Sequence, residues 1–216
     1  MHVLVTGCNR GIGRALCEAA LNRGWRVTGT ARAFTDLPDV DLIECDLENV
    51  ARLDEVFAGL VPLDVLINNA GEVGPVRQSP LDMDFAGFRR TLTTNTLAPL
   101  AVAQACLPAL RQRRGSRILS LSSQMSWMGY RKSDRIAYRA SKAALNKVMQ
   151  GLATELEPEE ITVALVDPGW VRTDMGGSEA EEDPMEVAKG ILSLAEGLDI
   201  KDTGKFFRFT GEERPF

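Results

Sequence analysis

The chain has 216 residues, of which 44% are hydrophobic and 25% are charged, as is usual for a globular protein of one domain or two small ones. Its formal net charge of −5 argues against general binding to nucleic acids or to anionic membranes. The single histidine, His2, argues against a Ser-His-Asp hydrolase, a multi-histidine metal site and acid–base catalysis centred on histidine, so we expect no bound metal.

Strand-like and helix-like segments alternate along the first half of the chain. Short apolar or β-branched runs predict strands, and the amphipathic stretches between them predict helices. In chain order these are a strand at Val3–Thr6, a helix at Ile12–Asn22, strands at Arg26–Ala31 and Leu42–Cys45, a helix at Asn49–Leu60 and a strand at Val65–Asn68. Gly24 suits the C-cap of the first helix, and Asn49 suits the N-cap of the second.

The same alternation continues through the second half. In chain order it predicts two helices within Met83–Leu110 that separate near Asn95, a strand at Arg117–Leu121, a helix at Arg135–Leu156 ended by Pro158, a strand at Thr162–Val166, a helix at Pro184–Glu196 and a strand at Lys205–Phe209. This βαβ pattern predicts an α/β fold in three layers, a doubly wound parallel sheet of seven strands with helices on both faces. We expect residues 1–216 to form one such domain.

Three glycines, Gly7, Gly11 and Gly13, lie between the first strand and the first helix. Glycines there allow a tight turn and close approach of the backbone, and the helix N-terminus offers free N–H groups to a pyrophosphate. Loop glycines are often simple turn formers, so the strand–turn–helix context is what favours a dinucleotide site.

The residue after the second strand indicates which nucleotide is bound. An acidic residue there would bind a ribose 2′-hydroxyl, whereas an arginine would accept a 2′-phosphate. The sequence has Arg32 at this place and no acid, and Arg10 in the glycine turn adds a second cation. Because arginine–phosphate contacts are charge-assisted, we expect NADP(H) to be preferred over NAD(H); the alternative is that both arginines are simply solvated.

Tyr138 and Lys142 are four residues apart on a predicted helix and therefore share one of its faces. A free tyrosine has a pKa of about 10, which is too high for acid–base work near neutral pH. A nearby ammonium favours the phenolate, so we expect Lys142 to lower the pKa of Tyr138. Many helices contain such a spacing by chance, but this pair offers the proton transfer that the missing histidine cannot.

The motifs occur in an order that resembles the short-chain dehydrogenase/reductase (SDR) family over nearly the whole chain. They are Thr6-Gly-x-x-x-Gly-x-Gly13, Asn68-Asn-Ala-Gly71, a serine pair at a strand end, Tyr138-x-x-x-Lys142 and Asp167-Pro-Gly169. Finer features resemble the small carbonyl-reductase-like branch of sniffer-like and C-factor-like proteins, namely Tyr138–Asn146, Pro168–Gly177 and Gly204–Gly211. The resemblance implies a Rossmann fold and an NADPH-dependent oxidoreductase that reduces an aldehyde or ketone to an alcohol by hydride transfer.

The resemblance also implies a role for each matching residue. Tyr138 would act as the general acid/base that protonates the carbonyl oxygen, and Ser123 would hydrogen-bond that carbonyl. Lys142 would hold the nicotinamide ribose hydroxyls, and Asn95 would support a water in a proton relay. The cofactor-binding residues would be Gly7, Asn9, Arg10, Gly11, Ile12, Gly13, Arg32, Asp46, Leu47, Asn69, Ala70, Gly71, Tyr138, Lys142, Pro168, Gly169, Val171 and Thr173.

The substrate side is less defined by the sequence. Ser122 is the rival of Ser123 for the catalytic position, because an insertion at 127–134 lengthens the spacing to Tyr138. The candidates to line a substrate pocket are Gln124, Met125, Trp127, Trp170 and Met175, although such residues serve cores as often as ligands. A short lid, at about residues 174–184, predicts an open and permissive site for a small-molecule carbonyl substrate.

Other functions stay open at this point. The chain could be a nucleotide-binding regulatory or signalling protein on the same fold, because fold alone does not determine function. Nucleic-acid binding through Arg111, Arg113, Arg114 and Arg117 is the other alternative, although arginines at a helix end also suit the helix dipole. A homodimer or higher homo-oligomer could form through the helix that begins near Arg135.

The four cysteines form no C-x-x-C pair, which favours buried free thiols in a reducing compartment. No apolar run reaches the ~20 residues that a membrane span needs, and the first residues do not resemble a signal segment. We therefore expect a cytoplasmic protein that binds neither membranes nor nucleic acids.

Overall fold

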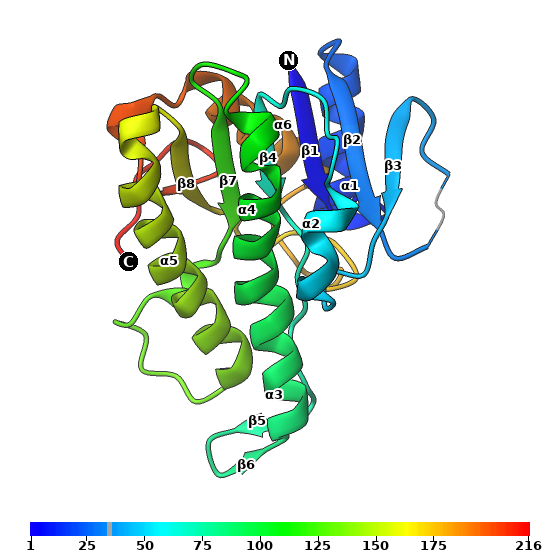
Figure 1. The fold of residues 1–216 in the computed structure, drawn as a ribbon. Helices are drawn as coiled ribbons and strands as arrows, with labels where there is room; N and C mark the ends of the chain where they lie inside the picture. The colour runs from blue at the N-terminus through cyan, green and yellow to red at the C-terminus, as the bar shows by residue number, and fades with distance from the viewer. Residues whose placement is uncertain (34–35) are drawn as a thin grey trace.

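The structure is a computed structural model, and it describes residues 1–33 and 36–216. A seven-stranded sheet forms its centre in the order β3-β2-β1-β4-β7-β8-β9, and all neighbouring strands are parallel (Figure 1). The strands are β1 (His2–Thr6), β2 (Arg26–Ala31), β3 (Val40–Glu44), β4 (Val65–Asn68), β7 (Arg117–Leu121), β8 (Thr162–Asp167) and β9 (Phe206–Arg208). The predicted doubly wound α/β fold is confirmed, and the strand order reverses between β1 and β4, the place where such sheets bind ligands.

Helices cover both faces of the sheet, which makes three layers. One face carries α1 (Gly11–Asn22) and α6 (Pro184–Gly197), and the other carries α2 (Leu53–Val56), α4 (Ala98–Leu110) and α5 (Ile136–Leu156) (Figure 1).

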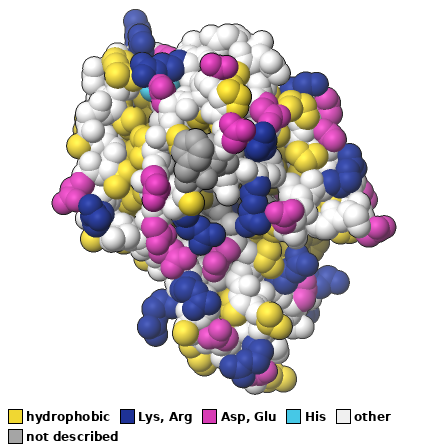
Figure 2. All heavy atoms as spheres, turned by 90° about the vertical axis from the view of Figure 1, so that its right-hand side faces the viewer, with side chains coloured by type: hydrophobic (Ala, Val, Ile, Leu, Met, Phe, Trp, Pro, Cys, Tyr) yellow, Lys and Arg dark blue, Asp and Glu magenta, His cyan; other side chains and the backbone are white. Residues whose placement is uncertain are grey.

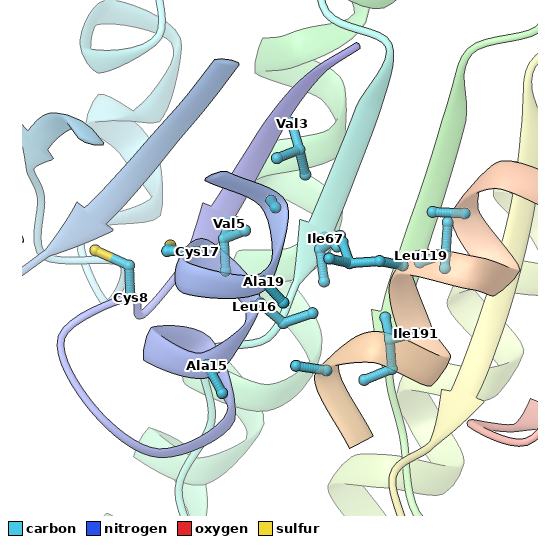
Figure 3. Packing of buried hydrophobic residues seen from close by; sticks show 14 of the residues in the cluster. Val3, Val5, Cys8, Ala15, Leu16, Cys17, Ala19, Ile67, Leu119 and Ile191 are labelled. Atoms are coloured by element: carbon cyan, nitrogen blue, oxygen red, sulfur yellow. The ribbon is translucent and has the colours of Figure 1, made fainter. Parts of the chain in front are cut away.

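Two hydrophobic cores, one on each face, hold the layers together. Successive strand residues point to opposite faces, so Val3 and Val5 enter the core under α1 and α6, whereas Leu4 enters the core under α4 and α5. Figure 3 shows the first of these cores, where Leu16 of α1 and Ile191 of α6 lie over the sheet. All three strand residues are fully buried, which fits a strand covered on both sides.

The predicted helix at Asn49–Leu60 is wrong in length. The structure has a 3₁₀ turn at Val50–Arg52 and the single turn of α2. Asn49 does occupy the N-cap position, but its side chain makes no capping hydrogen bond. Gly59 has a φ of 80°, a left-handed conformation that a continuing right-handed helix does not adopt.

The segment from Met83 to Leu110 also differs from expectation. Its two helices, α3 (Phe85–Leu92) and α4, are joined without a break by a π-helical turn, Thr93–Leu97, that contains Asn95. Ahead of α3 lies a small hairpin of β5 (Gln78–Ser79) and β6 (Asp82–Met83), which the sequence analysis did not predict. The hairpin and α3 extend past the carboxyl ends of the main strands (Figure 1).

The four arginines considered as a nucleic-acid surface are engaged within the molecule. Arg111, Arg113 and Arg114 form ion pairs with Glu159, Asp64 and Glu160, and Arg117 donates to the carbonyls of Leu198 and Gly115. Figure 2, which looks onto another side of the molecule, shows acidic and basic side chains interspersed. Across the two described ranges, no helix is both long and apolar enough to cross a bilayer.

Candidate active site

Most of the predicted cofactor residues lie on the segments that leave one edge of the sheet. Because all seven strands are parallel, their carboxyl ends share this edge. The segments are the glycine turn after β1, Arg32 after β2, Asp46 after β3, Asn69–Gly71 after β4, Ser122 and Ser123 after β7, and Pro168–Thr173 after β8. The other predicted cofactor residues differ in exposure. Asn9 is exposed and Val171 is buried, and the half-buried ones are Ile12, Leu47, Ala70, Gly71 and Pro168.

The glycine turn has the shape of a phosphate cradle. Gly7 and Gly11 adopt left-handed φ values of 69° and 53°. A Cβ at Gly13 would lie 2.0 Å from the carbonyl oxygen of Gly7, so the start of α1 packs against the end of β1 more closely than any side chain permits. The first turn of α1 has neither a capping side chain nor an acidic residue, which leaves its N–H groups available to an anion.

Side chains at the ends of β1 and β2 and directly after β4 hold this cradle in place. The Asn69 amide donates to the carbonyl oxygens of Thr6 (2.8 Å) and Gly7 (3.1 Å). The Thr6 hydroxyl accepts the N–H groups of Asn69 and Ala70, both at 3.0 Å, and the Thr30 hydroxyl accepts that of Gly7 at 3.3 Å. Thr6 and Thr30 are not among the site residues predicted from the sequence. The position of Thr6 directly before the first glycine is the signal that could have identified it.

The charged residues near the turn are exposed. The Arg10 guanidinium forms an ion pair of 2.9 Å with Asp174 of the predicted lid, and Arg32 and Asp46 are also exposed. A Cβ at Gly11 would lie 3.2 Å from the Thr173 methyl group, so the base of the lid packs against the glycine turn. The structure therefore brings together segments more than 160 residues apart in the sequence.

Helix α5 carries Tyr138 and Lys142 on one face. Lys142 is buried, and its ammonium donates to the carbonyl of Leu121 at 2.7 Å and lies 5.8 Å from the centroid of the Tyr138 ring. Burial raises the pKa of the Tyr138 phenol, and the nearby Ser123 side chain lowers it by a smaller amount. Burial also lowers the pKa of Lys142 to about 8.

The expectation that Lys142 lowers the pKa of Tyr138 is not supported by this structure, because the charges that shift this pKa are those of Asp167 and Arg135 and do not include Lys142. Burial raises the pKa of the phenol and disfavours the charge of the lysine, so the two groups share one desolvating environment. A raised pKa keeps Tyr138 protonated at neutral pH.

The two serines after β7 have different surroundings. The Ser122 hydroxyl is buried and donates to the Asn146 side-chain oxygen at 2.5 Å. Ser123 is half-buried, and its hydroxyl accepts the N–H of Met125 as well as contacting Tyr138. The geometry therefore favours Ser123 over Ser122 as the partner of Tyr138.

Asn95 links the segment that follows β4 to helix α5. Its side-chain oxygen accepts the N–H of Glu72 at 2.9 Å, and its amide donates to the Glu72 carbonyl at 2.8 Å and to the Ser141 hydroxyl at 3.0 Å. Asn95 is fully buried in the π-helical turn, a feature that often marks functional sites. Its side chain is fully occupied in holding the backbone beside Gly71 and Lys142.

The predicted substrate residues are mostly exposed. Trp127 packs edge-to-face on Tyr130, and the indole of Trp170 donates to the Gly176 carbonyl at 2.8 Å. Gln124 and Met175 are exposed, and Met125 is half-buried. A groove of about 440 Å³ lies instead between residues 73–79 and 133–135, and the predicted substrate residues do not line it. It adjoins α5, since Gln78 in its wall accepts the N–H of Tyr138 at 3.4 Å.

The buried ammonium of Lys142 has a consequence for stability. The pKa of Lys142 is lowered from 10.5 to about 8. The charged lysine therefore reduces the free energy of unfolding at pH 7 by roughly 3 kcal/mol. We expect Lys142→Met to raise the free energy of unfolding at pH 7 by about 1–2 kcal/mol, because losing the bond to the Leu121 carbonyl offsets part of the gain. The gain should shrink as the pH rises from 8 toward 10.5, where the wild-type lysine no longer opposes folding.

Urea unfolding at pH 7 and pH 10 measures this prediction. Lys147→Met changes an exposed lysine of the same helix and serves as the matched control. A Lys142→Met protein that is less stable than the wild type at pH 7 would show that the buried ammonium does not oppose folding.

The sequence of this chain is similar to those of several known proteins. A family model described as short chain dehydrogenase matches residues 1–184. C-signal from Myxococcus xanthus is 42% identical over 156 residues, which cover 72% of this chain and 93% of that protein. L-xylulose reductase from Bos taurus is 31% identical over 216 residues, which cover 94% of this chain and 86% of that protein.

Solved structures give the same result for the fold. Carbonyl reductase Sniffer of D. melanogaster superposes with a TM-score of 0.91 at 30% identity, covering 100% of this chain and 99% of that one. An NADPH-bound carbonyl reductase from chicken fatty liver superposes with a TM-score of 0.90 at 26% identity, covering 100% and 98%.

Proposed function

Because the chain belongs to the short-chain dehydrogenase family, we propose that it is an NADPH-dependent oxidoreductase that reduces an aldehyde or ketone to an alcohol. The observation that carries the proposal is the contact between Tyr138 and Ser123 above the buried Lys142, at the sheet edge where the glycine turn opens. An acid, a hydrogen-bond donor and a nucleotide cradle at one place are what carbonyl reduction needs.

The glycine cradle fits a dinucleotide. The positive φ values of Gly7 and Gly11, the missing Cβ at Gly13 and the uncapped start of α1 leave room and N–H donors for a pyrophosphate. Asn69, Ala70, Gly71, Pro168, Gly169, Val171 and Thr173 would line the remainder, and Arg10 and Arg32 would bind the 2′-phosphate. When bound, the cofactor supplies the hydride.

The protein's own groups handle the proton. Ser123 would donate a hydrogen bond to the substrate carbonyl and polarise it, and Tyr138 would give its phenolic proton to the carbonyl oxygen. The raised pKa of Tyr138 keeps that proton in place at neutral pH. Lys142, whose ammonium is held by the Leu121 carbonyl, would bind ribose hydroxyls, and Asn95 would support the proton relay through the backbone that it fixes.

A cofactor-consumption assay tests the proposal. Purified protein is mixed with NADPH or NADH and a panel of aldehydes, ketones and dicarbonyls. We expect NADPH oxidation with several small carbonyl substrates, since the lid of about residues 174–184 is short and the site open. Binding of NADPH without turnover on any of them would refute the proposed reaction.

The nucleotide preference has its own test in Arg32. We expect Arg32→Asp to lower kcat/KM for NADPH by roughly 10–100-fold, because a charge-assisted contact with the 2′-phosphate is lost and repulsion replaces it. The efficiency with NADH should stay the same or rise. Arg114→Asp, at an exposed arginine of the loop before β7, is the matched control. Equal use of NADPH and NADH before and after the change at Arg32 would show that the assignment is wrong.

A second candidate is a nucleotide-binding regulatory or signalling protein on this fold. The relative named C-signal favours it, because it is 42% identical over most of the chain. The two candidates separate in cells that lack the native protein. Full rescue by Tyr138→Phe would favour signalling, whereas failure of that variant to rescue would favour the reductase.

The proposal also covers the domain organisation, oligomeric state and cellular compartment of the protein. Residues 1–216 would act as one NADP-binding domain on a small carbonyl compound, with the outer face of α5 available for a homodimer. The four cysteines are all buried free thiols, which suits a reducing cytoplasm.

A further inference from the structure

Four charged side chains meet beside the Pro168–Gly169 turn, and the proposed mechanism uses none of them. They are Asp167 at the end of β8, Glu182 in the lid, Arg208 of β9 and Arg214 of residues 210–216. Asp167 and Arg208 are partners in the register of β8 and β9. Arg208 pairs with Glu182 at 2.5 Å, and the Arg214 guanidinium lies 3.5 Å from the Asp167 carboxylate. We call these four residues the charge cluster.

The carboxylate of Asp167 is almost fully buried, with 1% of its side chain exposed. Its Oδ1 accepts the N–H of Gly169 at 3.0 Å, which fixes the turn that follows β8. Its Oδ2 has no hydrogen bond to any residue that the structure describes, and the ion pair with Arg214 supplies a counter-charge. A buried carboxylate that loses its partner is strongly destabilised, so Arg214 has more influence here than a surface arginine would.

Backbone contacts fix Arg214 in its place. Residues 210–216 return along β9, where the N–H of Arg208 donates to the Glu212 carbonyl and the N–H of Arg214 donates to the Phe206 carbonyl, both at 2.7 Å. The rings of Phe206 and Phe216 stack at 5.8 Å. These contacts order the segment and hold the Arg214 guanidinium next to Asp167.

The charge cluster also reaches the base of the lid. The Glu182 backbone pairs with Trp170 and Arg172, which closes the lid as a loop. A Cβ at Gly169 would lie 3.1 Å from the Glu182 side chain, so the lid base packs directly on the turn. The turn is thus held from one side by Asp167 and from the other by Glu182.

Charged groups from several elements face Tyr138. The negative charge of Asp167 raises the pKa of the phenol, and the positive charge of Arg135, at the start of α5, lowers it. Lys142 lies 5.8 Å from the ring centroid, and the polar side chain of Ser123 lowers the pKa of the phenol. A change in the net charge around Asp167 should therefore shift the pKa of the Tyr138 phenol.

We propose that Arg214 is a positioning residue of the active site: by pairing with Asp167 it holds the Pro168–Gly169 turn and sets the charge that faces Tyr138. The inference rests on the proposed function, which gives that turn and Tyr138 their roles. It assigns a role in catalysis to residues 210–216, which lie after the last strand of the sheet.

The test uses Arg214→Gln, Asp167→Asn and the double variant, each in a Tyr130→Phe background. The chain has two tyrosines, so this background leaves Tyr138 as the one phenol that titrates. Its ionisation is followed by the ultraviolet absorbance of tyrosinate, with circular dichroism to show that the protein stays folded. The dissociation constant for NADPH is measured by fluorescence titration.

The single variants should shift the midpoint of Tyr138 ionisation in opposite directions. Without Arg214 the charge of Asp167 is uncompensated, and the midpoint should rise by roughly half a pH unit to one unit. Asp167→Asn keeps an oxygen for the Gly169 N–H but removes the charge, so the midpoint should fall by a similar amount. The double variant removes both charges of the pair, so its midpoint should lie close to the background value. NADPH binding should weaken roughly threefold to tenfold in Arg214→Gln, because the turn is less well ordered before binding.

Glu212→Ala is the matched control, because Glu212 is exposed in the same segment. It should change neither the midpoint nor NADPH binding. If Arg214→Gln does not fold, Arg214→Lys replaces it, because the shorter ammonium keeps the charge but weakens the pair with Asp167, and the midpoint should then rise by a smaller amount. Midpoints that stay unchanged, or that shift in the same direction in both single variants, would overturn the inference. The absorbance titration needs no substrate, so a wild-type protein without turnover would refute the proposed function and leave this result intact.

Discussion

Replacing Tyr138 with Phe is expected to lower kcat for carbonyl reduction by roughly 10²–10⁴-fold, the usual effect of losing a general acid. The variant keeps the aromatic ring, so packing on α5 should change little. It loses the hydroxyl that lies near Ser123 and would give its proton to the substrate. Steady-state kinetics with NADPH and the best carbonyl of the panel give kcat, and fluorescence titration shows whether NADPH still binds.

Tyr130→Phe provides the comparison for this experiment. Tyr130 is exposed and packs against Trp127, so the variant should keep near-normal kcat. If Tyr138→Phe turns over as fast as the wild type while binding NADPH equally well, the phenol is not the proton donor.

The second large effect is expected at Gly13. In Gly13→Ala the new methyl group would lie 2.0 Å from the Gly7 carbonyl oxygen and 2.5 Å from the Asn69 amide, and the first of these is rigid backbone. Helix α1 must then move away from β1, which should destabilise the fold by about 3 kcal/mol. For a protein of this size that is a fall in Tm of roughly 6–12 °C. NADPH binding should weaken at least about tenfold, because the cradle no longer closes.

Thermal unfolding with and without NADPH measures both parts. Gly151→Ala is the control, since a Cβ at Gly151 on α5 meets open space. It should raise stability by about 0.5–1 kcal/mol, as expected for Gly replaced by Ala within a helix. A Gly13→Ala protein with the Tm and NADPH affinity of the wild type would show that the turn is not closely packed.

The sheet could be predicted from the sequence because its strands carry unambiguous patterns. Runs such as Val65–Asn68 and Thr162–Asp167 are buried at every position, and glycine or proline follows closely. A parallel order then places the glycine turn, the serine pair and the Pro168–Gly169 turn at one edge without further information. Apart from the segment 49–60 and the region before α4, the predicted boundaries lie within two residues of those observed.

The parts that could not be predicted depend on contacts between distant segments. Nothing local indicates that α2 stops after one turn or that Gln78 and Met83 pair in a hairpin. The pKa of Tyr138 depends on how deeply α5 is buried, so the spacing to Lys142 gave the wrong direction. Arg214 could not be assigned because its partner Asp167 lies 47 positions earlier in the chain.

The return of residues 210–216 along β9 also matters for how the protein behaves among its own copies. An open sheet has two edge strands whose free backbone groups can pair with another chain and begin aggregation. At β9 the returning segment occupies that position, with an antiparallel bridge between Phe207 and Glu213. At β3, the other edge, exposed Asp41 and Glu44 place charges along the strand. Both edges are therefore protected against intermolecular strand pairing, β9 by the returning segment and β3 by exposed charged side chains, of which Asp41 pairs with Arg26.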